Sequence, residues 1–476
     1  MAEIDTSLCV AASRARGLRP EDSATVRELV RVWERTRGRN ELRERYYLSH
    51  VPIRDLGIAI PPEVARRLRT RVDWPRKAVL ALANRSTFDG FTSDDAETEA
   101  ELGRISAAND LRALYRRNVV GELKHCCSFW TVTDAGGGSP VVSAYPATAA
   151  AAVWDDSLKA IRAGIVVAES RPVPGGSARL PSVLLAFTAT DVITLRRDPS
   201  TRLLWSASYQ PHSMGRPLME AMPWEPTLER PFGHSRITRT VMSITDDAIR
   251  QRARMEVAAE SSALPQMWLL GTAARMINDG NRYDASIGAL NEVTKDEDGD
   301  HPSVWQSTQL QMAPHIDYLR TLAQQFSSAT NVPLSELGVT TDNPSSAEAI
   351  YAAKEALVID AQNLNAQNGI ALRNVALMAL AVSRGGSFAE QRDSGVTVSV
   401  RWPDPAYPSV VAMADAMLKV AQTIPTAAGS EVVLERLGFN GDEILRLQRD
   451  MRAAQARQGI LSTLAGRAGA DAGDGS

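Results

Sequence analysis

The stretch that decides the fold is residues 345–383, SSAEAIYAAKEALVIDAQNLNAQNGIALRNVALMALAVS, which contains no proline and a single glycine, Gly369. Along it Ile350, Leu357 and Leu364 recur every seven residues, a spacing that puts apolar side chains on one face of a helix. At 1.5 Å per residue such a helix is about 55 Å long. Few compact enzymes need a helix of that length.

Two further helices are expected before this stretch. Helical spacing of apolar residues over about 236–263 ends at Pro265, and a second such run over 313–330 ends at Pro333. Between them, residues 264–312 form an irregular excursion. It opens with the apolar run Met-Trp-Leu-Leu-Gly and carries an acidic tip, made of Asp296, Glu297, Asp298 and Asp300.

The N-terminal part of the chain mixes helices with strands. We expect a helix over 22–38, stopped by Gly38, and a second over about 106–119. Runs rich in β-branched and apolar residues predict strands at 182–188, 191–196 and 202–209, the last two joined by a hairpin turn, followed by a proline-rich loop over 210–232.

The residues after the long helix predict one strand at 396–402 and two helices at about 409–424 and 441–464. The small, polar tail 465–476 is expected to be disordered. Together these elements predict an α+β protein that is mainly helical.

Composition excludes several classes of protein. The 476 residues include 53 Lys+Arg and 56 Asp+Glu, and the resulting net charge of -3 excludes a wholly basic surface for gripping nucleic acid. A local excess of basic residues, fourteen against seven acidic ones, lies between Arg27 and Lys77. It is either a solvated helical surface or a contact face for an acidic partner.

Three cysteines, two of them adjacent, do not make a disulfide framework, so we expect a reducing compartment. No secretory signal and no apolar run long enough to span a membrane is evident, and a soluble protein is predicted.

The sequence lacks the common catalytic motifs: there is no phosphate-binding Gly-x-x-x-x-Gly-Lys-Ser/Thr loop, no His-Glu-x-x-His and no Gly-x-Ser-x-Gly. His125 next to Cys126 and Cys127 is interpreted as a buried structural group, because neighbours in sequence point in different directions and no orienting acid is placed nearby. Residues 136–138, three glycines, are a loop tip. We therefore expect no catalytic residue, no metal and no cofactor.

Two motifs and the order of elements carry a resemblance to a known family. The first motif is PFGHSRI at 231–237, continued by helical residues to Pro265; the second is NVPLSELG at 331–338 followed by NPSSAEAI at 343–350. The chain resembles the portal proteins of tailed bacteriophages, particularly the long-tailed siphophage type. The similarity covers about residues 20–460, and the second motif is the more specific. Where some portal proteins have Gly-Arg-Ser in the first motif, this chain has Gly-His-Ser.

The resemblance implies a portal fold with wing, stem, clip and crown, a long kinked helix and a ring oligomer, usually of twelve subunits. It assigns 1–235 to the wing, 236–263 and 313–330 to the two stem helices, 264–312 to the clip and 331–345 to a tunnel loop. Residues 346–408 would be the long wing helix with its returning strand, and 409–464 the crown.

The resemblance also places candidate functional residues. The tunnel loop, from Leu334 to Asn343, contains no Lys or Arg and would face DNA. Its polar or acidic side chains are Ser335, Glu336, Thr340, Thr341 and Asp342. In the stem, Arg250 and Arg254 share a helix face and either line the channel or form salt bridges between subunits, the reading we favour, with Asp246, Asp247 and Glu256. The acidic tip 296–300 would be the clip surface that docks partners.

The function implied is a channel for packaging and ejecting double-stranded DNA at one capsid vertex, with no enzyme activity of its own. The implied partners are further copies of the chain, double-stranded DNA bound without sequence preference, the terminase, the head-completion adaptor, and the major capsid and scaffolding proteins. The implied location is the virion, and the host cytoplasm during assembly. Two alternatives remain open: a hydrolase or nucleotide-processing enzyme with an unrecognised site, and a helical scaffold or adaptor that forms no ring.

Overall fold

The computed structural model describes residues 9–52, 68, 70–173, 178–200, 203–262, 267–270, 303–306, 311–339 and 347–406, together with 417–419, 422–423, 430–436, 439 and 441–471. The chain divides into two compact units. The first comprises Met1–Tyr47, Ala78–Thr238 and Ser345–Ser476, and the second comprises Leu48–Lys77 and Arg239–Pro344. Each unit is considered by itself below.

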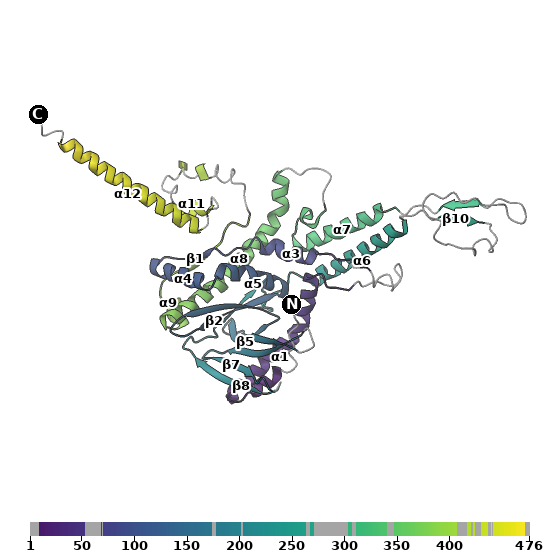
Figure 1. Ribbon diagram of the computed structural model, residues 1–476, viewed down its shortest axis with the longest axis horizontal. Helices are drawn as coiled ribbons and strands as arrows, with labels where there is room; N and C mark the ends of the chain where they lie inside the picture. Colours follow the sequence, from purple (N-terminus) through teal and green to yellow (C-terminus); the bar gives the residue numbers. More distant parts are fainter. Residues whose placement is uncertain are drawn as a thin grey trace, which may run out of the picture. The chain divides into compact units, whose positions relative to one another are not determined.

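The first unit combines helices with two antiparallel sheets and a short strand pair (Figure 1). Its strands are β1 (Gly90–Ser93), β2 (Cys127–Asp134), β3 (Pro140–Pro146), β4 (Ala150–Asp155), β5 (Ala160–Pro172), β6 (Arg179–Phe187), β7 (Asp191–Arg197), β8 (Trp205–Pro211), β9 (Met219–Pro223) and β12 (Val398–Arg401). The larger sheet has the order β4-β5-β6-β7-β8, the smaller one has the order β3-β2-β9, and β1 pairs with β12.

The helices of the first unit are η1 (a 3₁₀ helix, Cys9–Arg14), α1 (Pro20–Tyr47), α4 (Ala96–Ala108), α5 (Leu111–His125), α8 (Ala347–Arg384), α9 (Phe388–Asp393), α11 (Glu431–Arg436) and α12 (Gly441–Asp471), while α3 (Trp74–Ala83) begins in the second unit and ends in the first. The predicted α+β class is thus confirmed. In Figure 1 the long helix α8 is the green helix that crosses the strands.

The core of the first unit lies between α1 and the five-stranded sheet. Leu29, Val30 and Trp33 of α1 are buried against apolar residues of that sheet, such as Ile165 and Leu184. Trp33 also donates a hydrogen bond from Nε1 to the Thr148 carbonyl, 3.0 Å away. Burial of apolar area stabilises this layer by about 25 cal/mol per Å². Further apolar residues of the unit are buried on α5, β2 and α8, such as Leu123, Trp130 and Leu372.

Helix α1 corrects one prediction, because it does not stop at Gly38 but continues to Tyr47. The extra turns are held by long-range contacts that the sequence does not display. Asn40 donates to the Ala147 carbonyl, Arg43 donates to the His125 carbonyl, and the Tyr46 side chain is buried. Tertiary contacts of this kind outweigh the roughly 1 kcal/mol by which glycine disfavours a helix.

The helix predicted over 106–119 is also wrong in its bounds. The helical segment is interrupted at Asn109 and Asp110, between α4 and α5. Asp110 adopts a left-handed conformation with φ 49°. Asn109 anchors the break, since its side chain donates to the Pro140 carbonyl and accepts from the Val142 amide. Asparagine and aspartate tolerate such backbone and bond locally, so they terminate helices readily.

The predicted strands at 182–188, 191–196 and 202–209 correspond to β6, β7 and β8, and β7 and β8 pair antiparallel as the predicted hairpin. The stretch 210–232 is not a loop throughout, because it contains β9, which pairs with β2. The three glycines at 136–138 do form the turn between β2 and β3.

The long helix is observed as α8, 38 residues from Ala347 to Arg384, without interruption. The heptad residues Leu357 and Leu364 are buried, as the spacing predicted, and so is Ala371, seven residues further on. Helix α12 continues to Asp471, so residues 465–471 are helical rather than disordered. The alanines of that segment favour the helix.

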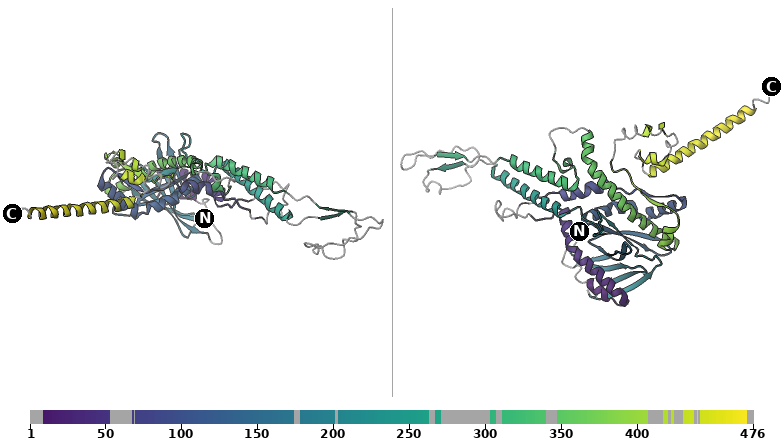
Figure 2. Two further views of the ribbon diagram at one scale, coloured as in Figure 1. Left: turned by 90° about the horizontal axis from the view of Figure 1, so that it is seen from above. Right: turned by 180° about the vertical axis from the view of Figure 1, so that it is seen from behind.

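The long helices described in the second unit are α6 (Arg239–Ser262) and α7 (Ala313–Thr330), and α7 has the predicted bounds 313–330. The two helices pack side by side, and the chain between them includes a strand pair, β10 (Met267–Leu270) with β11 (Ser303–Gln306) (Figure 2). Gln251 of α6 ties them together by donating to the His315 carbonyl at 3.0 Å.

Candidate functional site

The second motif lies just after α7, where the chain leaves the helix at Asn331 in a left-handed conformation. A single 3₁₀ turn follows, η3 (Leu334–Leu337), and Gly338 closes it with φ 81°. The Gly338 amide donates to the Ser335 carbonyl at 3.4 Å. The motif is therefore a tight turn whose proline and glycine set its backbone.

Of the seven residues expected in the tunnel loop, the structure describes three. Ser335 is exposed, while Leu334 and Glu336 are half-buried. The Glu336 carboxylate lies 3.5 Å from Nζ of Lys77, so its charge is partly neutralised within the unit. Thr340, Thr341, Asp342 and Asn343 lie outside the described residues.

The charged residues predicted for the stem lie on α6 and are all half-buried. Arg250 forms an ion pair with Asp247, one turn earlier on the same helix. Arg254, on the same face, has no acidic partner in the part of the chain that the structure describes, and its Nε is buried without a hydrogen bond. Arg250 and Arg254, which share a helix face, thus have different surroundings.

Glu256, the last of the predicted stem residues, is held from the segment before α3. Thr70 donates to its Oε2 at 2.7 Å, and Arg252 lies 3.9 Å from its Oε1. The acidic tip predicted for the clip, Asp296, Glu297, Asp298 and Asp300, lies outside the described residues.

The first motif, 231–237, is bonded to other elements inside the first unit. Gly233 has φ 71°, and a Cβ at this position would clash with the backbone oxygen of Trp224. Ser235 donates from Oγ to the Lys124 carbonyl at 2.5 Å, and the Arg236 amide donates to the Leu123 carbonyl at 2.9 Å. The motif therefore satisfies backbone acceptors at the C-terminal end of α5.

Arg236 extends this bonding to two other helices. Its side chain is only 6% exposed, and Nε donates to the Ala78 carbonyl at 2.8 Å while Nη1 lies 3.2 Å from Asp360 of α8. Burial lowers the pKa of Arg236, and the charge of Asp360 opposes this effect. A buried ion pair of this kind holds its elements together because either charge alone would be costly to bury.

A buried polar network fixes α8 against α5. Asn368 of α8 donates to Oε2 of Glu122 at 2.9 Å and to the Tyr115 hydroxyl at 3.0 Å. Ser86 donates to Asn365 at 2.6 Å and is 2.6 Å from the same Tyr115 hydroxyl. Burial raises the pKa of Glu122 well above its usual value.

The group at His125 has a partner that sequence reasoning missed. Glu44 of α1 lies 3.1 Å from His125 Nε2 and 2.6 Å from Lys124 Nζ. Burial raises the pKa of Glu44, yet the hydrogen bonds and charges of His125 and Lys124 lower it to about 2. No local signal marks Glu44, because it is some 80 residues away in sequence.

The adjacent thiols do not use this histidine as a base. His125 is fully buried, its Nε2 lies 3.1 Å from Glu44 and its Nδ1 has no hydrogen-bond partner among the described residues, so neither ring nitrogen is bonded to a thiol. Cys126 Sγ lies 3.9 Å from Cys127 Sγ, and both cysteines line a cavity of about 500 Å³. The reading of this group as structural fits the packing of its histidine.

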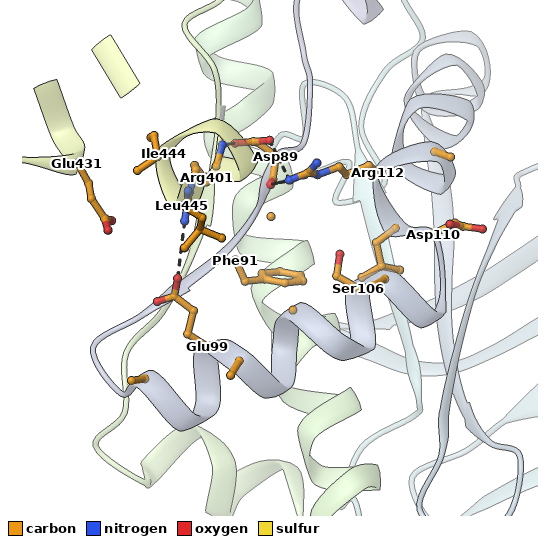
Figure 3. Close-up of a pocket in the computed structure, with 18 residues that line it drawn as sticks. Asp89, Phe91, Glu99, Ser106, Asp110, Arg112, Arg401, Glu431, Ile444 and Leu445 are labelled. Carbon is orange, nitrogen blue, oxygen red and sulfur yellow. Dashed lines mark hydrogen bonds and ion pairs between the residues drawn. The ribbon is translucent and has the colours of Figure 1, made fainter. Parts of the chain in front are cut away.

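A second cavity, of about 720 Å³, lies among β1, α4, α5 and the start of α12 (Figure 3). Its arginines are neutralised by nearby carboxylates. Arg112 lies 3.2 Å from Asp89, and Arg401 lies 3.7 Å from Glu99. Four carboxylates line the cavity against these two arginines, so it has no unpaired cation with which to hold an anion.

Among the described residues, no group of three or more His, Cys, Asp or Glu side chains is arranged to hold a metal ion. Within the same residues, no helix is both long and apolar enough to cross a bilayer.

Comparison with known proteins gives no match to a family model. Among solved structures, a chain of the virion of a native gene transfer agent particle aligns with a TM-score of 0.43 at 12% identity, covering 82% of this chain and 89% of the other. A chain from the neck of the native particle, computed with C12 symmetry, aligns with a TM-score of 0.42 at 13% identity, covering 91% and 99%.

Among curated proteins, the portal protein of Mycobacterium phage L5 is 26% identical over 457 residues, covering 93% of this chain and 92% of the relative. The portal protein of Mycobacterium phage D29 is 25% identical over 456 residues, covering 92% and 90%. These alignments run through both motifs and the long helix, because they span nearly the whole of each chain. The predicted resemblance to the portal proteins of tailed bacteriophages, of the long-tailed siphophage type, is thereby confirmed.

Proposed function

We propose that the chain is a portal protein, the subunit of a ring of about twelve copies that occupies one capsid vertex. The ring forms the channel through which double-stranded DNA is packaged and ejected. The observation that carries the proposal is the end-to-end similarity to two proteins named as portal proteins, which spans at least 90% of each relative. The proposed location is the virion, after assembly in the host cytoplasm.

In this proposal the first unit supplies the wing and the crown, and α6 and α7 are the stem. The acidic tip 296–300 belongs to the clip and docks the terminase and later the head-completion adaptor. The basic segment 27–77 contacts the major capsid or scaffolding protein. ATP hydrolysis belongs to the terminase, and the portal itself has no catalytic activity and needs no cofactor.

The charges of the second unit support a channel that does not trap DNA. Each cation that neutralises a phosphate adds affinity and salt dependence, so a conduit needs few unpaired cations. Arg250 is already paired with Asp247, and Lys77 lies 3.5 Å from Glu336. Residues 334–343 include neither Lys nor Arg, and we propose that this tunnel loop faces the duplex.

Arg254 is the stem residue proposed to act between subunits. It has no acidic partner among the described residues of its own chain. A neighbouring copy in a ring presents the same helix with its carboxylates, so a salt bridge between copies satisfies Arg254. Arg254→Gln is then expected to weaken ring assembly, whereas Arg250→Gln, whose partner is in its own chain, is expected to weaken it less.

The mass of the purified assembly tests the ring. Native mass spectrometry and class averages of electron micrographs are expected to show about a dozen subunits around a central hole. A monomer or dimer at all concentrations would refute the portal assignment and favour a helical scaffold protein. Reversing the charges of the acidic tip tests docking separately: unchanged terminase and adaptor binding would refute that role for 296–300.

A further inference from the structure

The cavity of about 500 Å³ that Cys126 and Cys127 line is formed within the first unit, between α1 and the turn at 229–234. Its floor includes three small residues of β4, Ala150 to Ala152, which are at most 4% exposed and close it on that side. Cys126 is half-buried, whereas Cys127 is 4% exposed. Cys126 is therefore the thiol that a molecule entering the cavity can reach.

The backbone at Cys126 adopts an uncommon conformation. Its φ of 92° lies in the left-handed region, which residues other than glycine rarely adopt. Two hydrogen bonds hold it there: its amide donates to the Glu122 carbonyl and its carbonyl accepts from the Trp224 amide, both at 2.9 Å. Such a conformation persists only where the surrounding structure enforces it, so the thiol is held in a fixed place.

The α1 side of the cavity is basic. Arg35, Arg39 and Arg43 follow one another at intervals of four residues, and all three line the cavity. Arg43 donates to the His125 carbonyl at 2.9 Å, which places its guanidinium next to the peptide group that precedes Cys126. Neither Arg35 nor Arg39 has an acidic partner in the described part of the chain.

The other charged groups of the lining leave this positive charge in excess. The turn at 229–234 contributes Glu229 and Arg230, both exposed, together with His234. Glu28 of α1 also lines the cavity but is ion-paired with Arg162 at 2.7 Å. Four arginines therefore stand against two glutamates, one of which already has a partner outside the lining.

These surroundings favour the thiolate form of Cys126. The hydrogen bond from Cys127 lowers the pKa of Cys126 to about 7; burial opposes this effect, while the charges of Arg43 and Arg39 and a hydrogen bond donated by Arg43 add to it. The same bond between the two cysteines, together with burial, raises the pKa of Cys127. Cys127 thus remains a thiol that donates, and Cys126 is the nucleophile of the pair.

We propose that Cys126 is a site of thiol–disulfide exchange with small disulfides that carry carboxylates. The Cys126 thiolate attacks one sulfur of the disulfide, whose S–S bond breaks as a new S–S bond to Cys126 forms. The other half of the reagent leaves as a thiolate and takes a proton from water. Cys126 is thereby oxidised to a mixed disulfide, and the half that leaves is reduced to a thiol. The proposal does not rest on ring formation.

The cavity selects its reagent by charge. The arginines attract carboxylates toward the thiolate, whereas they repel a disulfide that carries ammonium groups. One half of glutathione disulfide, a tripeptide with two carboxylates and one ammonium group, has the charge that the lining of the cavity favours. We therefore use glutathione disulfide as the probe for this class of reagent.

Cys127 does not displace the bound half of the reagent. The peptide bond between Cys126 and Cys127 is trans, so their Cα atoms are about 3.8 Å apart, less than the ~4.4 Å at the short end of ordinary disulfides. Closing a ring between the two thiols would distort a backbone that the contacts of Cys126 already fix. The mixed disulfide at Cys126 is therefore the end product.

The test compares the rates at which the folded full chain reacts with glutathione disulfide and with cystamine, a small disulfide that carries ammonium groups. The same ratio for the chain unfolded in urea corrects for the intrinsic difference between the reagents. At low ionic strength we expect folding to favour glutathione disulfide by about tenfold or more, and added salt to reduce this preference. An equal ratio in the folded and unfolded chain would refute the proposal.

The site of reaction is located by peptide mapping with mass spectrometry. One glutathione adduct is expected, at Cys126, and none at Cys9, which is fully buried. Cys126→Ser should abolish the adduct, and Cys9→Ser should leave the rate unchanged. An adduct that forms first at Cys127, or a disulfide between Cys126 and Cys127 in place of the adduct, would overturn the inference.

Charge variants test the arginines. Arg35→Glu combined with Arg39→Glu is expected to lower the preference for glutathione disulfide by about tenfold or more. Arg31→Glu combined with Arg45→Glu is the matched control, because both arginines are exposed on the same helix and neither lines the cavity. Equal effects of the two double variants would show that net charge selects the reagent, and not the cavity. Far-ultraviolet circular dichroism verifies that each variant is folded.

The pH dependence of the rate tests the role of Cys127. The rate with glutathione disulfide should rise with pH to a midpoint near 7, because the thiolate is the reacting form. Cys127→Ser keeps a hydrogen-bond donor and should preserve this midpoint, whereas Cys127→Ala removes the donor and should move the midpoint upward. A wild-type midpoint near the ordinary cysteine value of about 8.5 would contradict the assignment of Cys126 as an activated thiol.

Discussion

The motif at 231–237 and the motif at 331–338 look alike in sequence, each a proline, a glycine and small polar residues next to a helix, but they stand in different surroundings. In the first, Ser235 and Arg236 are buried and bonded to several helices of their unit. In the second, Ser335 is exposed and the described side-chain contact of Glu336 is a partly exposed ion pair.

The difference separates two reasons for a motif to exist. Residues 231–237 pack inside the first unit and donate hydrogen bonds to backbone carbonyls there. Their role is therefore to stabilise the fold. Residues 331–338 set the direction of the backbone and leave side chains available to a ligand or partner. Four measurements test this contrast, beginning with the one in which we expect the largest effect.

Replacing the two glycines separates the motifs most strongly. Gly233→Ala places a Cβ against the Trp224 carbonyl in a backbone with φ 71°, so we expect a loss of more than about 3 kcal/mol or failure to fold. Gly338→Ala has φ 81° but meets no heavy atom within 4 Å, and a loss of about 1 kcal/mol is expected. Urea unfolding measures both, and similar losses would remove the contrast.

The ion pair between Arg236 and Asp360 comes next. Arg236→Met leaves Asp360 poorly solvated without its partner, and we expect a loss of about 3 kcal/mol. A double-mutant cycle with Asp360→Leu should recover part of this loss, because the second change removes the unpaired charge. If Arg236→Met unfolds at the wild-type urea concentration, the stabilising role of this motif is wrong.

The free energy of unfolding in acid tests the C-terminal end of α5, to which the first motif is bonded. There Glu44 pairs with Lys124 and His125. The folded pKa of Glu44, about 2, lies below its usual value of 4.5, so its stabilisation is present above about pH 5 and is lost as the pH falls toward 2. We expect about 2 kcal/mol of this acid-induced loss to be absent in Glu44→Gln. Parallel stability curves of the two proteins from pH 6 to 3 would contradict the assignment.

The smallest effect is expected at the second motif. Lys77→Met removes a pair whose lysine side chain is 44% exposed, so global stability should change by less than about 1 kcal/mol. Hydrogen exchange at the Gly338 and Val339 amides should nevertheless become faster, because the turn loses its tether. Addition of salt to the wild type should move exchange in the same direction. Exchange that is identical in both proteins would show that Lys77 does not restrain the turn.

Local patterns in the sequence predicted the helices well. The bounds of α7 follow from helical spacing and Pro333, and α8 follows from a stretch free of proline. In the N-terminal half, strands β2 to β5 were missed. In β4, for example, Ala150 to Ala152 are all buried, so no alternation of polar and apolar residues marks the strand.

The candidate site was predictable only in part. The turn at 334–338 follows from its proline and glycine, which act locally. The partners of its side chains did not, because Lys77 and Glu336 are far apart in sequence, as are Glu44 and His125. Tertiary contacts of this kind also carried α1 past Gly38, where local propensity predicted an end.

The buried network on α8 has a mechanical consequence. Asn365 and Asn368 are bonded to Ser86, Tyr115 and Glu122, which lie in an otherwise apolar layer. Sliding the helix along its axis by one turn, about 5.4 Å, would separate all of these groups at once and leave each without water. The network therefore opposes sliding of α8 along its own axis. A force along α8 is passed to α5 through these hydrogen bonds.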